Sequence, residues 1–136
     1  MSHEDALPPV PLACLICDQV LTDETTKKKS LIGVFDHIWV SEFPTHHGPI
    51  ALYARFYDAQ GDYDVRVEYL KVDDQSVLGD ASGNIHVAER DQTVEFAINL
   101  PNVEIPEPGK YEFRVHLNGQ YFQSARFKAI SREDSN

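Results

Sequence analysis

Basic side chains are scarce in this sequence. Twelve lysines and arginines stand against 22 aspartates and glutamates, so the formal net charge is −10. A surface with this charge repels phosphate backbones, which argues against general nucleic-acid binding, and it disfavours anionic membranes for the same reason. The only basic run is Lys27-Lys28-Lys29, and we expect a solvated loop there rather than a docking site.

Long apolar runs are also missing. The longest fall well short of the ~20 residues that a membrane-spanning helix needs, and residues 1–11 lack the charged and apolar regions of a signal peptide. We therefore expect a cytoplasmic protein. Residues 12–130 have the length of one domain, with a flexible N-terminal segment over 1–11 and a flexible tail over 131–136.

Cysteine occurs only twice, at Cys14 and Cys17. A redox-active pair would stand at the start of a helix, where the helix terminus lowers the thiol pKa. A zinc site would need a second pair of ligands. The segment 12–21 instead has the composition of a strand, in which positions i and i+3 point to opposite faces. We expect two buried, reduced thiols with a structural role.

Turn residues recur about every ten positions, with short β-rich runs between them, which is typical of a sandwich or barrel. Apolar and polar residues alternate cleanly in 50–57 and 63–72, the period of a strand with one buried face. The predicted strands are 12–21, 31–40, 50–57, 63–72, 93–100, 110–117 and 120–130, with weaker ones around 76–78 and 84–88 and loops at 22–30, 42–49 and 101–109.

The last two strands meet at Asn118-Gly119, a strong hairpin signal. A three-residue loop with Gly119 left-handed would pair odd positions with odd positions, whereas a two-residue loop would expose Phe127. We predict the longer turn, because it places on the core face the odd-numbered residues Tyr121, Ala125, Phe127 and Ala129.

One segment indicates the type of sandwich. A Pro-Gly pair ending at Gly109 precedes Tyr-x-Phe-x-Val, which resembles the tyrosine corner at the start of strand F in immunoglobulin-like domains, with Tyr111 as the corner. No cysteine follows two residues later, so the antibody-type disulfide is absent. We predict an all-β fold, an immunoglobulin-like antiparallel β-sandwich of seven to eight strands.

Four segments together resemble a bacterial family of small uncharacterised proteins. They are Cys17-Asp18-Gln19, the SLIGVFDHI segment 30–38, Phe43-Pro44, and the EPGKYEF segment 107–113. The similarity extends over most of 12–130, and its motifs consist of glycine, aspartate and core aromatic residues. The resemblance implies a cytoplasmic β-sandwich without an assigned activity.

Catalytic constellations are not recognisable. The sequence has no G-x-S-x-G and no phosphate-binding glycine loop, and its histidines are scattered. Glycoside hydrolases use a pair of carboxylates. With 22 acidic residues the sequence offers many such pairs, so their presence does not indicate this activity. We interpret His46-His47 as a polar loop and Asp58, Asp62 and Asp64 as turn residues. We therefore expect no catalytic residues, no metal site and no cofactor.

Several residues are expected to have structural rather than functional roles. Asp18 and Asp36 interrupt apolar strands, where a carboxylate points outward or accepts hydrogen bonds at a strand end. Gly33, inside a predicted strand, marks a bulge or a close backbone approach. The residues with expected structural roles are Asp18, Gly33, Asp36, Gly109, Tyr111 and Gly119.

The outward faces of the strands predict binding. If 50–57 and 63–72 form a hairpin, Tyr53, Arg55 and Tyr57 lie beside Arg66, and on the other hairpin Arg114 lies near Phe122. Tyrosine and arginine dominate many binding surfaces, although single exposed aromatics are also ordinary. We expect a non-catalytic protein-binding or assembly module whose partner is an unidentified protein or a second copy.

Two alternatives remain open at this stage. A small-ligand or carbohydrate-binding module would use Tyr53, Tyr57 and Phe122 as stacking platforms. A hydrolase with an unrecognised carboxylate or metal site is the third possibility, and fold alone does not choose among the three.

Overall fold

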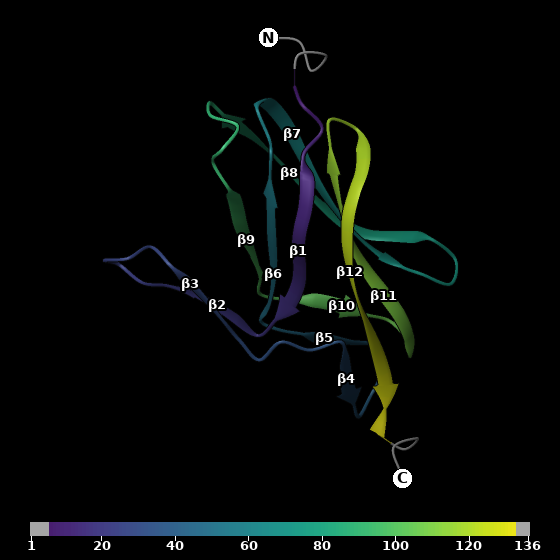
Figure 1. Cartoon of the computed structure of the whole chain (residues 1–136). Coiled ribbons are helices and arrows are strands. Elements are labelled where there is room, and N and C mark those ends of the chain that lie inside the picture. Colours follow the sequence, from purple (N-terminus) through teal and green to yellow (C-terminus); the bar gives the residue numbers. More distant parts are fainter. Residues whose placement is uncertain (1–5, 133–136) are drawn as a thin grey trace.

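The computed structural model describes residues 6–132. Two sheets pack face to face (Figure 1), which confirms the predicted all-β sandwich. The three-stranded sheet has the order β1-β6-β9 and the five-stranded sheet the order β4-β12-β11-β7-β8. Their bounds are β1 Val10–Cys17, β4 His37–Val40, β6 Ile50–Tyr57, β7 Gly61–Lys71, β8 Ser76–Val87, β9 Val94–Leu100, β11 Gly109–Leu117 and β12 Gln120–Ser131.

The core lies between the two sheets and follows the alternation of the sequence. Leu52 and Phe56 of β6 are fully buried, and they face the alternate residues of β7 and β11 across the sandwich. Aromatic rings stack there: the centroids of Tyr69 and Phe113 are 4.8 Å apart. Burial of this apolar surface, worth roughly 25 cal/mol per Å², holds the sheets together.

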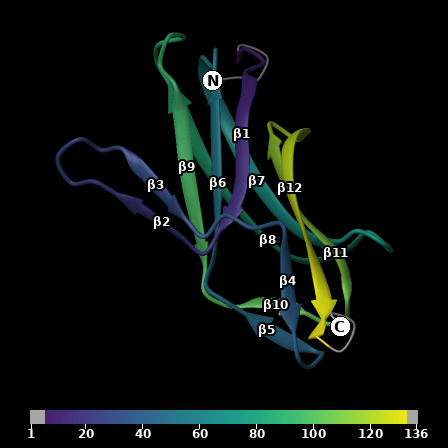
Figure 2. The same ribbon diagram turned by 60° about the horizontal axis from the view of Figure 1, so that its bottom comes forward.

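Four short strands form two further pairs. β2 (Gln19–Thr22) pairs with β3 (Lys29–Ile32), and β5 (Thr45–His47) pairs with β10 (Val103–Ile105). β5 and β10 lie within segments that we had expected to be loops. We call residues 19–32 the arm, because β2 and β3 project from the sandwich as a separate hairpin (Figure 2).

The first two predicted strands are both divided. The expected strand 12–21 breaks at Asp18 and the expected strand 31–40 breaks after Ile32. At these two points the chain leaves the sandwich to form the arm and then returns to it. β4 adds to the other sheet, where it runs parallel to β12, with Ile38 opposite Ala129.

β8 is continuous, so the prediction of two weak strands split by Gly79 and Gly83 is wrong. It pairs with β7 along its whole length, with one irregularity between Tyr69 and Leu70. β8 lies at the edge of its sheet. Its backbone hydrogen bonds to β7 are therefore enough to keep it a strand, even where its side chains are too small to pack.

The hairpin between β11 and β12 differs from the prediction of a three-residue loop. Asn118 and Gly119 form a two-residue turn with positive φ at both positions (51° and 79°), and Leu117 pairs with Gln120. The register then shifts between Val115 and His116. This bulge returns the odd residues Ala125, Phe127 and Ala129 to the core, and leaves Tyr121 exposed.

The ends of the sandwich are ordered beyond the predicted limits. β1 begins at Val10 rather than Leu12, and Leu7 is held by a hydrogen bond of 3.0 Å from its N–H to the carbonyl of Gln60. β12 extends to Ser131. The rest of the two predicted flexible segments, 1–5 and 133–136, lies outside the described residues. No helix within 6–132 is long and apolar enough to span a bilayer.

Candidate binding surfaces

The predicted binding face does not exist as one surface. β6 pairs with β1 and β9, whereas β7 pairs with β8 and β11, so the two strands belong to different sheets. Their connection crosses the sandwich, and Ala59 within it is fully buried. Tyr53, Arg55 and Tyr57 therefore lie on the outer face of one sheet, and Arg66 lies on the outer face of the other.

On the three-stranded sheet, Tyr53 and Arg55 share one partner from the neighbouring strand. The Tyr53 hydroxyl donates to Glu95 Oε2 at 2.5 Å, and Arg55 Nη1 donates to the same oxygen at 3.4 Å. Burial and then the Glu95 carboxylate raise the pKa of Tyr53. Only 7% of Tyr53 is exposed, which makes it a poor stacking platform.

Phe122 is half-buried and packs against the core between the sheets. It is the bulged residue of β12, and its ring packs edge-on against Phe56 with centroids 5.3 Å apart. The prediction that Phe122 lies beside Arg114 on an outer face is therefore wrong.

The outer face of the five-stranded sheet holds a buried carboxylate, Glu112, which is 2% exposed. Arg126 Nε donates to its Oε2 at 2.6 Å, Arg114 Nε donates to Oε1, and the Ser124 hydroxyl donates at 3.3 Å. Burial works to raise the pKa of Glu112, but the two guanidinium groups outweigh burial and hold it below its usual value.

A second set of ion pairs continues this face toward β8. Glu68 lies 2.6 Å from His116 Nε2 and 3.5 Å from Arg66 Nη2, and Arg66 also lies 3.2 Å from Asp80. Arg66, Arg114 and Arg126 thus each have a carboxylate partner. The positive and negative side chains of this face are already paired with one another. None of these arginines is left without a carboxylate to bind a charged ligand.

The histidine pair of β5 and the two cysteines of β1 lie on different strands. His46 and His47 are neighbours on β5, so their side chains point to opposite sides. Within residues 6–132 no three histidine, cysteine or acidic side chains gather to hold a metal. Both cysteines are free thiols, but only Cys17 is buried as expected, whereas Cys14 is half-buried. Burial raises the pKa of Cys14 to about 12 and also raises that of Cys17, which suppresses the reactive thiolate.

The remaining structural residues stabilise turns and strand ends. The Tyr111 hydroxyl donates to the carbonyl of Glu107 at 2.6 Å and accepts from the N–H of the same residue at 3.3 Å, the local geometry of a tyrosine corner. The side chain of Asp36 is exposed and lies 2.7 Å from His37 Nδ1. Gly109 has a positive φ of 145°.

A different site opens between β8 and β9, the edge strands on one side of the sandwich. On β8, Gly79, Ala81 and Gly83 lie opposite Tyr69, Val67 and Val65 of β7. Directly paired residues share a face, so all three small residues point inward. A Cβ atom at Gly79 or Gly83 would meet nothing within 4 Å. Three successive inward positions therefore leave space unfilled.

This space is an apolar cleft. It consists of two adjoining hollows of about 410 and 330 Å³ that share Val67, Ala81 and Ile98. The inward side chains of β9 (Val94, Phe96, Ile98 and Leu100) are only half-buried, because they face the small residues of β8. The charged side chains that line the larger hollow are Asp80 and Glu104, with His46 near them.

Sequence reasoning missed this cleft because it interpreted the glycines of 79–83 as strand breaks. The signal was nevertheless present: Gly79, Ala81 and Gly83 recur at a spacing of two, so one face of a strand in this segment has no side chain larger than a methyl group. The local pattern does not predict that this face lies opposite the apolar strand β9, because that placement depends on the tertiary fold.

These features define an all-β sandwich that is open along one side. Residues 12–130 match the model of a family described as a family of unknown function, DUF6941, and the chain belongs to this family. The match spans the segments whose motifs resembled an uncharacterised family. No curated protein matches the chain.

Proposed function

We propose that this chain is a non-catalytic protein-binding module that accepts an extended apolar segment of a partner in the cleft between β8 and β9. One observation carries the proposal: Gly79, Ala81 and Gly83 leave the inward face of β8 over 79–83 without a side chain larger than a methyl group, opposite the half-buried apolar face of β9. A packed core ordinarily has no such gap, so side chains from outside the chain fill it.

Both strands that flank the cleft support binding of a strand. β8 and β9 each have one paired neighbour, β7 and β6 respectively, and lie at the ends of their sheets. Unpaired N–H and C=O groups on such an edge are a template for an added strand. An added segment would place alternate side chains in the cleft, and the carboxylates of Asp80 and Glu104 favour basic residues at its exposed positions.

The immunoglobulin-like type of the sandwich is part of this proposal. Such domains place strands A, B and E in one sheet and C, F and G in the other. In chain order β1, β6 and β9 take the places of A, B and E, and β7, β11 and β12 those of C, F and G. The corner formed by Tyr111 at the start of β11 supports the same assignment. We also propose a cytoplasmic location, which the two free thiols favour.

The test uses synthetic peptides about seven residues long, the length of an ordinary strand, with valine or leucine at alternate positions and lysine or threonine between them. Affinity is measured by fluorescence anisotropy against the full chain. Ala81→Leu, which fills the cleft from β8, should weaken binding at least about tenfold, a cost of about 1.4 kcal/mol.

Lys128→Leu is the control, because Lys128 is an exposed residue of β12 that lines neither hollow of the cleft. It should leave the affinity unchanged. Failure of the alternating peptides to bind better than scrambled ones, or equal binding by Ala81→Leu, would contradict the proposal. Binding of a small apolar dye in the cleft without any peptide would favour the small-ligand alternative instead.

A further inference from the structure

The arm is a two-stranded hairpin that stands apart from both main sheets (Figures 1 and 2). β2 pairs only with β3 in its sheet, through four residue pairs from Gln19–Ile32 to Thr22–Lys29. A hairpin of this kind is marginally stable in water at best. Something that covers the arm would therefore stabilise it.

The arm carries apolar side chains that the fold leaves uncovered. Its strands contain Val20, Leu21, Leu31 and Ile32, and none of these four is buried. The pairing puts Leu21 and Ile32 on the same face of the hairpin, and each is 45% exposed. These two aliphatic side chains on one exposed face offer apolar contact area to a second surface.

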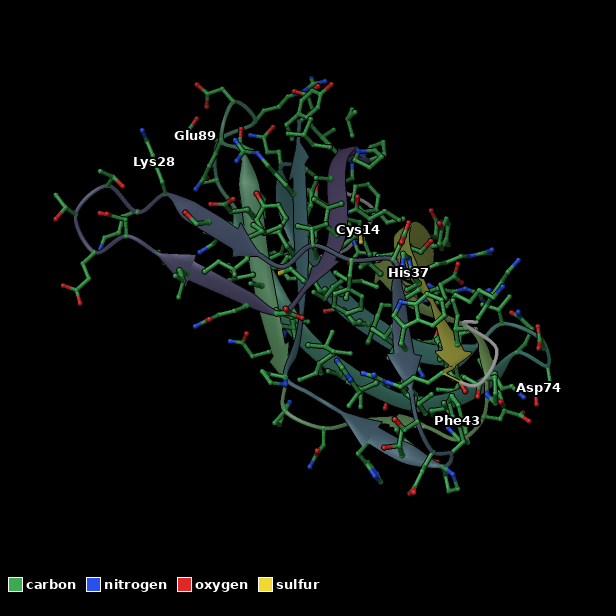
Figure 3. All side chains as sticks on the ribbon, turned by 90° about the horizontal axis from the view of Figure 1, so that it is seen from below. Cys14, Lys28, His37, Phe43, Asp74 and Glu89 are labelled. Carbon is green, nitrogen blue, oxygen red and sulfur yellow. The ribbon has the colours of Figure 1, made fainter. Side chains whose placement is uncertain are left out.

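Charge is distributed unevenly between the arm and the rest of the chain. The arm holds Lys27, Lys28 and Lys29 against Asp23 and Glu24, a net charge of +1. Since the whole chain has a charge of −10, the remainder has −11. Lys28 points away from the sandwich near the end of the arm (Figure 3). The tip of the arm is therefore complementary to the body of another copy of the same chain.

We infer that the arm is a self-association element: two copies pack their arms side by side and antiparallel, as a symmetric dimer. The faces formed by Leu21 and Ile32 meet at the centre, and the lysines at each tip lie against the acidic body of the other copy. The same patch serves both copies, so the assembly closes at two. This inference does not depend on the cleft between β8 and β9.

The test is sedimentation velocity of the full chain over a range of micromolar concentrations and at low and high salt. The unmodified chain should dimerise, and high salt should weaken the dimer because it screens the lysines. The double variant Leu21→Ser/Ile32→Ser should raise the dimer dissociation constant at least about tenfold. Lys27→Glu/Lys28→Glu/Lys29→Glu should weaken the dimer and reverse its salt dependence, because salt then screens a repulsion between the arm and the acidic body.

Val77→Ser is the matched control, because Val77 is an aliphatic residue on β8 that is 51% exposed. It should leave the dimer intact, and so should Ala81→Leu, which tests the cleft separately. Circular dichroism establishes that each variant is folded. A chain that sediments as a monomer at every concentration, or a dimer that survives the arm variants, overturns the inference.

Discussion

The backbone of Gly33 lies directly against the side chain of Asp18: a Cβ atom at position 33 would lie 2.3 Å from Asp18 Oδ2. The N–H of Asp18 in turn lies 3.0 Å from the carbonyl of Ile32 and 3.1 Å from that of Gly33. The two residues thus form the junction at which the arm leaves the sandwich. Both lie in the motifs that resembled the family, and this contact gives those motifs a structural reason.

Gly33→Ala should destabilise the fold by about 1–2 kcal/mol, because φ at this position is +73°, where a Cβ atom is unfavourable. Chemical denaturation with urea measures the change. Gly83→Ala is the control, since a Cβ atom there meets nothing within 4 Å, and it should be neutral or slightly stabilising. Equal stability of the two variants would contradict the account of the Asp18–Gly33 junction.

Glu112→Gln should lower the free energy of unfolding at neutral pH by about 1.5–3 kcal/mol, the range for hydrogen bonds to charged groups. The substitution removes the charge that Arg114 and Arg126 enclose. Denaturation curves at neutral pH measure the loss. Glu89→Gln, on an exposed residue, provides the control and should change little.

The effect of Glu112 should also depend on pH. Its pKa is lowered in the folded state, so the folded protein binds this proton less readily than the unfolded chain does. The stabilisation is complete above the ordinary pKa of 4.5 and is lost as the pH falls through the lowered value. The difference between the original chain and Glu112→Gln should therefore shrink in acid; a constant difference would argue against the ion pairs.

Tyr111→Phe should cost about 1–3 kcal/mol, because the backbone groups of Glu107 lose their hydroxyl partner in a protected site. Thermal and urea unfolding both report this loss. Tyr121→Phe removes a hydroxyl that bonds Ser124 on the exposed face and should cost much less. If the two tyrosines prove equivalent, Tyr111 does not act as a corner.

Cys14 should be nearly inert in the folded protein. With a pKa of about 12, only about one thiol in ten thousand is ionised at about pH 8. Labelling with a thiol-specific disulfide reagent should be slow in buffer and complete in guanidinium chloride. A Val77→Cys variant supplies an exposed thiol and should label quickly under native conditions. Rapid native labelling of the unmodified chain would contradict the burial of its thiols.

The alternation of residues predicted individual strands well but not their partners. Ile50–Tyr57 has the predicted bounds, and its even-numbered residues face the core. The sequence predicts a turn between β6 and β7, which would allow a hairpin, yet the chain there crosses from one sheet to the other and buries Ala59. A short polar connection is compatible with both outcomes, and packing over the whole chain decides between them.

Near Gly119, the turn that the local sequence favours differs from the register that the core requires. Asn118-Gly119 favours a two-residue turn, while the core requires Ala125 and Phe127 to face inward. The bulge at Phe122 satisfies both the turn and the core register. No pattern in the sequence predicts this bulge. The burial of Glu112 was equally hidden, because it depends on Arg126, which is opposite Glu112 on the next strand.

The parallel pairing of β4 with β12 has a mechanical consequence. A pull on the amino end of β4 and on the carboxyl end of β12 acts along this pair in opposite directions. Because the strands run parallel, with His37 opposite Lys128 and Val40 opposite Ser131, the pull slides them along each other and loads all of their hydrogen bonds together. Antiparallel strands pulled from a shared end would open one bond at a time. The pair of β4 and β12 is therefore arranged to resist shear.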